Sequence, residues 1–170
     1  MGVPLYVALY TTEVSGDYYW ALVVGDNICD RVTAYQIKKG SPCGAGWLKG
    51  DKKNAGLEAS RTFLCCVQLP TVHKTKQALE AFITQVPAVP DDRNALDSHD
   101  EWSCAQWVVD VIRRLCEDKS IKPDLGKSSW EGVYFRIVVL VQDYQRGAQF
   151  EMVGNIPVLQ YPVWEEEEED

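Results

Sequence analysis

The sequence predicts a single domain with an α+β fold. Strand patterns fill roughly the first 70 residues and helical patterns follow from Thr71 onward, and this order is typical of α+β proteins. At 170 residues the chain is long enough to bury one sizeable core. We therefore expect an antiparallel sheet of about four to six strands packed against about three helices, over residues 1–163.

The strands are predicted from alternation and from β-branched and aromatic residues. "PLYVALYTT" indicates a strand at 4–12, and "DYYWALVVGDN" a second at about 17–25, whose Gly-Asp-Asn turn leads into a third, "CDRVTAYQIK". These three favour an antiparallel meander. "KKGSPCGAGWLKGDKKNAG" is predicted to be a loop because glycine and lysine dominate it. The apolar run "SRTFLCCVQLP" predicts a buried strand at 60–69.

The periodicity then changes to that of helices. The sequence predicts a helix from Thr71 to Pro87, because its apolar residues would lie on one face: Val72, Leu79, Phe82, Ile83 and Val86. In "EWSCAQWVVDVIRRLCED" apolar residues recur at helical spacing, which predicts a helix with a core-facing stripe that includes Cys104 and Trp107.

The C-terminal part completes the expected architecture. Ser128 and Glu131 match an S-x-x-E capping box for a third helix over about 129–146. "NIPVLQYPV" indicates a final extended segment. Residues 164–170 are interpreted as an acidic, solvated tail, because like-charge runs seldom pack.

Charge and hydropathy narrow the classes of partner. The formal charge is −8, and six of the negative charges lie in Glu165–Asp170. Without a basic patch we expect no nucleic-acid partner. No apolar stretch is long enough for a membrane span, and the start of the chain lacks the pattern of a secretory signal, so we expect a cytoplasmic monomer or homodimer.

The cysteines do not indicate a metal site. The chain has six cysteines and two histidines, but no C-x-x-C pair. We expect reduced thiols that mostly behave as small buried hydrophobes, with neither a metal nor a cofactor.

Cys104 is the candidate nucleophile. It lies in the first turn of its expected helix, where the partial positive charge of a helix N-terminus lowers a thiol pKa. Cys104 also lies on the apolar stripe, so a core thiol is the plainer interpretation of its position. Catalysis further requires a base, usually a histidine oriented by a third group.

The stretches "LYVALY", "YYWALVVG" and "WSCAQWVVDVIRRL", in this order, resemble an uncharacterised family of small fungal proteins. Its members carry a Y-H-W-A-L strand and a helix that opens with W-N-C. The resemblance covers roughly residues 5–118. A histidine on an early strand with a cysteine at a later helix N-terminus is similar to permuted papain-like folds, such as NlpC-type peptidases and lecithin:retinol acyltransferase. The resemblance thus implies that fold and, by analogy alone, thiolate chemistry.

The chain departs from this pattern at the bases. Tyr19 stands where the strand pattern has histidine, and "VTAYQIK" places Ala34 and Tyr35 where a second histidine is expected. Ser103 replaces the asparagine of W-N-C. Tyrosine, with an unperturbed pKa of about 10, is a poor base at neutral pH.

The two remaining histidines are weaker candidates for a base. His73 is expected to be a solvated residue near the start of the helix that follows it. His99, five residues before Cys104, is an alternative base if its loop folds back, although a surface histidine is the plainer interpretation.

We expect an aromatic cleft at this position. Its catalytic candidates are Cys104, Tyr19 and His99, and its substrate-binding candidates are Tyr35, Trp47, Trp102 and Trp107. Strand alternation lets only one of Tyr19 and Trp20 face the cleft, by analogy Tyr19. Trp47 is a candidate lid residue or a loop anchor, whereas for Trp20 and Trp107 core packing is the plainer role.

Three functions remain open. The favoured one is a non-hydrolytic cyclase, isomerase or pericyclase of fungal secondary metabolism that acts on a hydrophobic small molecule by shape and hydrogen bonding. The second is a cysteine-dependent acyltransferase or hydrolase that uses Cys104. The third is a non-catalytic binding or regulatory module.

Overall fold

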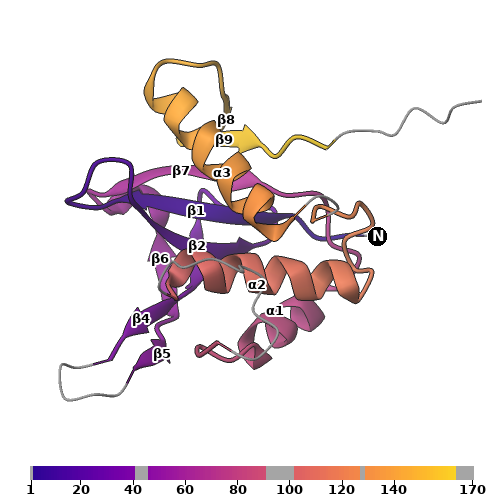
Figure 1. Ribbon diagram of the computed structural model, residues 1–170. Coiled ribbons are helices and arrows are strands. Elements are labelled where there is room, and N and C mark those ends of the chain that lie inside the picture. Colours follow the sequence, from indigo (N-terminus) through magenta and orange to yellow (C-terminus); the bar gives the residue numbers. More distant parts are fainter. Residues whose placement is uncertain (1, 41–45, 91–101, 127–128, 164–170) are drawn as a thin grey trace, which may run out of the picture.

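A computed structural model describes residues 2–40, 46–90, 102–126 and 129–163 as one α+β domain built on a seven-stranded sheet. The sheet order is β6-β3-β2-β1-β7-β9-β8, and a separate two-stranded ribbon pairs β4 with β5 (Figure 1). The strands are β1 Leu5–Thr11, β2 Tyr18–Val24, β3 Arg31–Tyr35, β4 Ile37–Lys39, β5 Trp47–Lys49, β6 Lys52–Gly56, β7 Phe63–Gln68, β8 Glu151–Val153 and β9 Ile156–Gln160.

The pairing is antiparallel except at one place. The meander predicted from β1 to β3 is confirmed. The parallel pair β7–β9 joins the C-terminal segment to the middle of the sheet, with Cys66 opposite Val158. The sheet is therefore mixed, and it has more strands than the predicted four to six.

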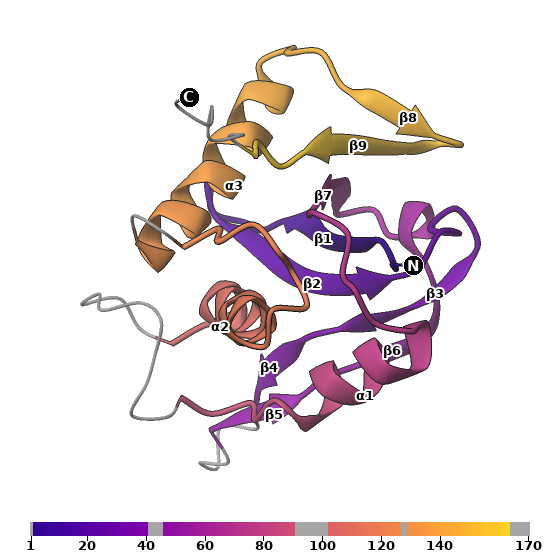
Figure 2. The same cartoon turned by 90° about the vertical axis from the view of Figure 1, so that its right-hand side faces the viewer.

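In the part of the chain that the structure describes, three α-helices pack on the sheet, as predicted. They are α1 Lys76–Gln85, α2 Cys104–Glu117 and α3 Trp130–Gln145, and a short 3-10 helix, η1, spans Leu57–Ala59. Figure 2 shows α2 and α3 on the same face of the sheet. Side chains of α1, α2 and α3 all belong to one buried cluster, so the three helices share a core with this face.

Strand alternation divides the core into two layers. On β2, Trp20 and Leu22 join the larger cluster under the helices, while Ala21 and Val23 join a smaller one on the opposite face. Residues of neighbouring strands are divided between the two clusters in the same way. The helices therefore cover one face of the sheet, and the smaller cluster lies on the other.

Helix α2 is buried on almost all sides, although a single core-facing stripe was predicted. Eleven of its fourteen residues are buried, including Asp110 and Arg113. The Arg113 Nε atom donates to Asp110 Oδ1 at 3.2 Å, which keeps the two buried charges paired. Polar residues of α2 thus also contribute to the packed interior.

The helix starts differ slightly from the sequence expectation. Thr75 caps α1 by accepting a hydrogen bond from the Ala78 amide, so the helix begins at Lys76 rather than Thr71. The Ser129 side chain caps α3 by accepting from the Gly132 amide at 3.0 Å. The predicted cap Ser128 lies outside the described residues, and with Ser129 as the cap Glu131 is one position too early for a capping box.

The predicted loop over 38–56 is wrong in part. It contains the end of β4 and all of β5 and β6, and Trp47 therefore lies on a strand. The third predicted strand is also divided, because β3 joins the main sheet while β4 pairs with β5. The acidic residues 164–170 lie outside the described residues.

Candidate functional site

A cleft of about 670 Å³ opens beside the N-terminus of α2. Its walls come from the β1–β2 turn, the first residues of β2, the first turn of α2, β5 and α3. Its lining includes Glu13, Asp17, Tyr19, Trp20, Trp47, Ser103, Cys104 and Tyr134. Two hollows of similar volume, about 640 and 600 Å³, are lined by none of the predicted site residues.

Cys104 is the first residue of α2, as predicted, and its thiol is buried at the cleft. The backbone N–H of Trp20 on β2 donates to Cys104 Sγ at 3.4 Å. Burial raises the pKa of the Cys104 thiol, and the negative charge of Asp17 raises it further. Hydrogen bonding from the backbone amides of Trp20, Ala105 and Cys104 itself lowers this pKa, but burial outweighs them. The thiol is therefore neutral at neutral pH.

No imidazole lines this cleft among the residues that the structure describes. His73 donates its backbone N–H to the Ser120 carbonyl, beyond the C-terminus of α2. Because a fourteen-residue helix is about 20 Å long, His73 lies far from Cys104. His99 lies outside the described residues.

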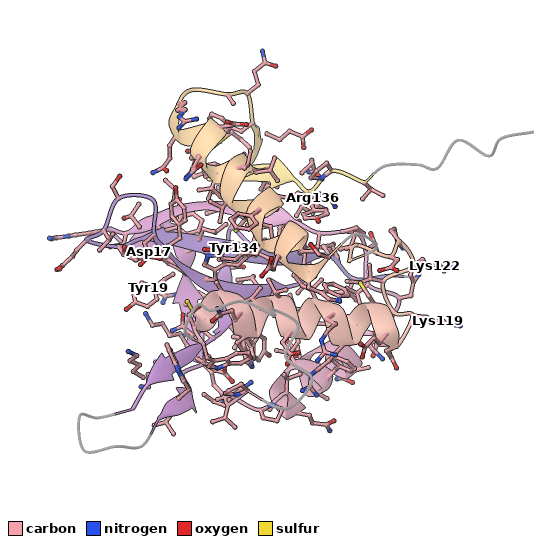
Figure 3. The ribbon with its side chains drawn as sticks, in the orientation of Figure 1. Asp17, Tyr19, Lys119, Lys122, Tyr134 and Arg136 are labelled. Carbon is pink, nitrogen blue, oxygen red and sulfur yellow. The ribbon has the colours of Figure 1, made fainter. Side chains whose placement is uncertain are left out.

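Tyr19 and Trp20 both line the cleft, so the expectation that only one of them faces it is wrong. Their side chains do alternate, since Tyr19 is 58% exposed and Trp20 is 2% exposed. However, β3 pairs with β2 only at Leu22 and Val23, which leaves this end of β2 uncovered on that side. The cleft is therefore lined by both residues at the strand edge. In Figure 3 Tyr19 and Asp17 lie at the left-hand end of the sheet.

Trp20 and Tyr134 form the aromatic floor. Their rings stack with centroids 5.4 Å apart and an angle of 7° between the planes. Tyr134 is half-buried on α3, while Trp20 is packed into the core beneath it. This stack connects α3 to β2 directly next to Cys104.

Trp47 lines the cleft from β5, the strand that Lys49 anchors. The Lys49 Nζ atom donates to the carbonyls of Ile83 and Val86 at 3.2 and 3.3 Å and lies 4.3 Å from the centre of the Trp107 ring. Burial lowers the pKa of Lys49. The β4–β5 ribbon is thus anchored to the C-terminus of α1, which favours a fixed wall over a hinged lid.

Trp102 and Trp107 contact the segment that follows the C-terminus of α1, and they do not line the cleft. The indole N–H of Trp107 donates to the Pro87 carbonyl at 3.1 Å, and that of Trp102 to the Ala88 carbonyl at 2.9 Å. Trp107 is fully buried. These two of the three predicted substrate-binding tryptophans therefore hold the segment that follows α1, because their N–H groups donate hydrogen bonds to its carbonyls.

Tyr35 also lies away from the cleft. It is buried on β3, opposite Leu22 of β2. Burial, together with the nearby carboxylates of Glu80 and Asp51, raises the pKa of Tyr35 to about 12. Of the four predicted substrate-binding residues, only Trp47 lines this cleft.

Sequence reasoning missed Glu13, Asp17 and Tyr134 as lining residues. Asp17 lies two residues before Tyr19, which the resemblance had placed beside Cys104, and this nearness in sequence was the available signal. Tyr134 gave no local signal, because its role depends on the stack with Trp20 across the fold.

The described residues offer no group of three or more His, Cys, Asp or Glu side chains that could hold a metal ion. Within the same residues, no helix combines the length and the apolar character that crossing a membrane requires.

One family model matches residues 4–169 of the chain, and its description is "Family of unknown function (DUF6914)". No curated protein and no solved structure matches the chain.

Proposed function

Because the chain belongs to the DUF6914 family, whose function is unknown, we propose its function from the geometry of the cleft: it is a small-molecule-binding enzyme of the cyclase or isomerase type. In this proposal an apolar substrate body lies on the Trp20–Tyr134 floor. Shape and hydrogen bonding promote a non-hydrolytic rearrangement, and Cys104 acts as a neutral thiol.

The state of Cys104 carries this proposal. The thiol has a pKa raised by burial, and no imidazole lines the cleft in the described part of the chain. A neutral thiol is a weak nucleophile, so the described part of the cleft offers acyl transfer neither an activated sulfur nor an imidazole base. The cleft also offers aromatic rings and hydroxyl groups, which can bind a substrate and restrain its conformation.

We further propose that the scaffold is a degenerate, permuted papain-like fold. The contact between the Trp20 amide and Cys104 Sγ supports it, because it brings the helix-start cysteine against the strand that carries Tyr19.

A specific observation favours cysteine-dependent acyl transfer as the second candidate. Cys104 lies at a helix N-terminus, and three backbone amides lower its pKa. The full chain and Cys104→Ala are compared for p-nitrophenol release from p-nitrophenyl butyrate. The proposed function expects equal rates, whereas release that depends on Cys104 would favour the acyltransferase or hydrolase.

A variant with a blocked cleft distinguishes an enzyme from a non-catalytic binding module. The Ser103 side chain makes no cap hydrogen bond, so Ser103→Trp fills the cleft mouth without removing one. A small-molecule extract is incubated with the wild type and with this variant. A compound that changes chromatographic retention at constant mass with the wild type alone supports an isomerase. A compound retained unchanged supports a binding module.

A further inference from the structure

The charged groups of the Cys104 cleft all have one sign. Of the described residues that line it, Glu13 and Asp17 alone carry a charge, and both are carboxylates. The remaining lining groups are hydroxyls, aromatic rings and small apolar side chains. A bound ligand therefore meets acidic groups at the β1–β2 turn and an apolar floor at Trp20 and Tyr134.

Asp17 is held at this position by the turn. Its Oδ1 atom accepts the Tyr18 backbone N–H at 3.1 Å, and its carbonyl accepts the Thr12 hydroxyl at 3.2 Å. Within the described chain, neither Asp17 nor Glu13 forms an ion pair. The second carboxylate oxygen of Asp17 is thus available to a ligand.

The charge of Asp17 reaches the floor of the cleft. It contributes to the raised pKa of Cys104, so the two groups interact electrostatically. Burial raises the pKa of Tyr18, and Arg146 at the C-terminus of α3 opposes this shift, but Arg146 does not line the cleft.

The N-terminus of α2 alone would favour an anion. Here, however, the backbone amides of Cys104 and Ala105 interact with the Cys104 sulfur. An anion placed at the cleft would therefore compete with Sγ for donors while it faced two carboxylates.

From this arrangement we infer that the cleft binds a small molecule with a cationic amine on an apolar, aromatic-sized body. The ammonium group lies between the Asp17 carboxylate and the exposed ring of Tyr19, and the body stacks on Tyr134 above Trp20. This inference rests on the proposed function, which makes the cleft a ligand site, and it adds the charge of the substrate.

The test uses three indole probes with similar bodies: tryptamine, which is cationic, tryptophol, which is neutral, and indole-3-propionate, which is anionic. Binding to the full chain is followed by NMR shifts of the Trp20 and Cys104 amides. We expect tryptamine to bind about five- to tenfold more tightly than tryptophol, and indole-3-propionate to bind most weakly. Added salt should reduce the preference, because the carboxylates are exposed to solvent.

A matched pair of variants locates the effect. Asp30 resembles Asp17, since its Oδ1 atom also accepts the backbone N–H of the next residue, but it lies outside the cleft. Asp17→Asn should lower the preference for tryptamine about threefold, whereas Asp30→Asn should leave it unchanged.

The outcomes separate the two proposals. Equal affinity for tryptamine and tryptophol, with shifts at both amides, would overturn the inference about charge and leave the ligand site in place. A lack of shifts at both amides with all three probes would count against the proposed function itself. An equal effect of Asp17→Asn and Asp30→Asn would show a general field rather than recognition by Asp17, and would also overturn the inference.

Discussion

The backbone amide of Trp20 donates a hydrogen bond to the Cys104 sulfur at 3.4 Å, across 84 positions of sequence. This contact joins the start of α2 to the uncovered end of β2. It places the thiol on the floor of a cleft whose lining residues, within the described chain, include aromatic rings and carboxylates but no imidazole. Cys104 is therefore a buried neutral group at the start of α2.

Lys49 is expected to stabilise the contact between β5, the C-terminus of α1 and Trp107 of α2. Lys49→Met removes two hydrogen bonds to the carbonyls of Ile83 and Val86 and the contact with the Trp107 ring. We expect the free energy of unfolding to fall by about 1–2 kcal/mol, allowing for the partial exposure of Lys49. Urea denaturation measures the change. Lys53→Met, at an exposed position on β6, is the control, and an equal effect in both variants would contradict the anchoring role.

Asp118 is expected to make stability depend on acid pH. A hydrogen bond from the Ser120 hydroxyl, and then one from Lys74, lower the pKa of Asp118 below its ordinary value of 3.8. The ionised form is thus favoured by folding. Its contribution to stability is complete above the unfolded-state pKa and is lost as the pH falls through the lower folded-state pKa.

Asp118→Asn should therefore flatten the loss of stability between about pH 5 and pH 2. Thermal unfolding followed by circular dichroism across this range measures the slope. Glu58→Gln removes an exposed carboxylate of η1 and serves as the control. A slope in Asp118→Asn as steep as that of the wild type would exclude this contribution.

Lys119 occupies a backbone conformation that suits glycine. Its φ is 59°, and it follows α2 where the Ser120 amide returns to the Leu115 carbonyl. Relief of the left-handed strain, about 1–2 kcal/mol, exceeds the entropy that glycine loses on folding, about 0.5–1 kcal/mol. Lys119→Gly should thus raise the free energy of unfolding by up to about 1 kcal/mol.

Asn54 provides the comparison, because its φ is also 59°. Asparagine tolerates this conformation better than lysine, so Asn54→Gly should stabilise the protein less. Urea midpoints of the two variants measure the difference, and a larger gain at Asn54 would contradict the explanation.

Much of the fold could be predicted from local patterns. The strands β1, β2 and β7 and the apolar stripe of α1 at Leu79 and Ile83 follow from periodicity, and the structure confirms them. The strands β5 and β6 could not be found in this way, because lysine and glycine have low strand propensity and pairing decides their conformation. The parallel pairing of β9 with β7 is also decided by tertiary packing.

The candidate site could likewise be predicted only where local sequence determines it. The place of Cys104 at a helix start was predicted from its own neighbourhood. In contrast, the roles of Trp102 and Trp107 depend on the carbonyls of Ala88 and Pro87, which no local pattern connects to them. A tryptophan that fills a pocket and one that satisfies a buried carbonyl have the same sequence signal, and only the tertiary structure distinguishes them.

The rate of alkylation of Cys104 by iodoacetamide is the most direct test of the central claim, that this thiol is neutral and not activated. The rate is followed from about pH 6 to pH 9 by mass spectrometry of the Cys104 peptide, with free cysteine as the reference. The expected result is alkylation slower than that of free cysteine at every pH, with a midpoint shifted to higher pH. Faster alkylation near pH 7, with a midpoint below that of free cysteine, would contradict the account and identify Cys104 as an activated thiolate.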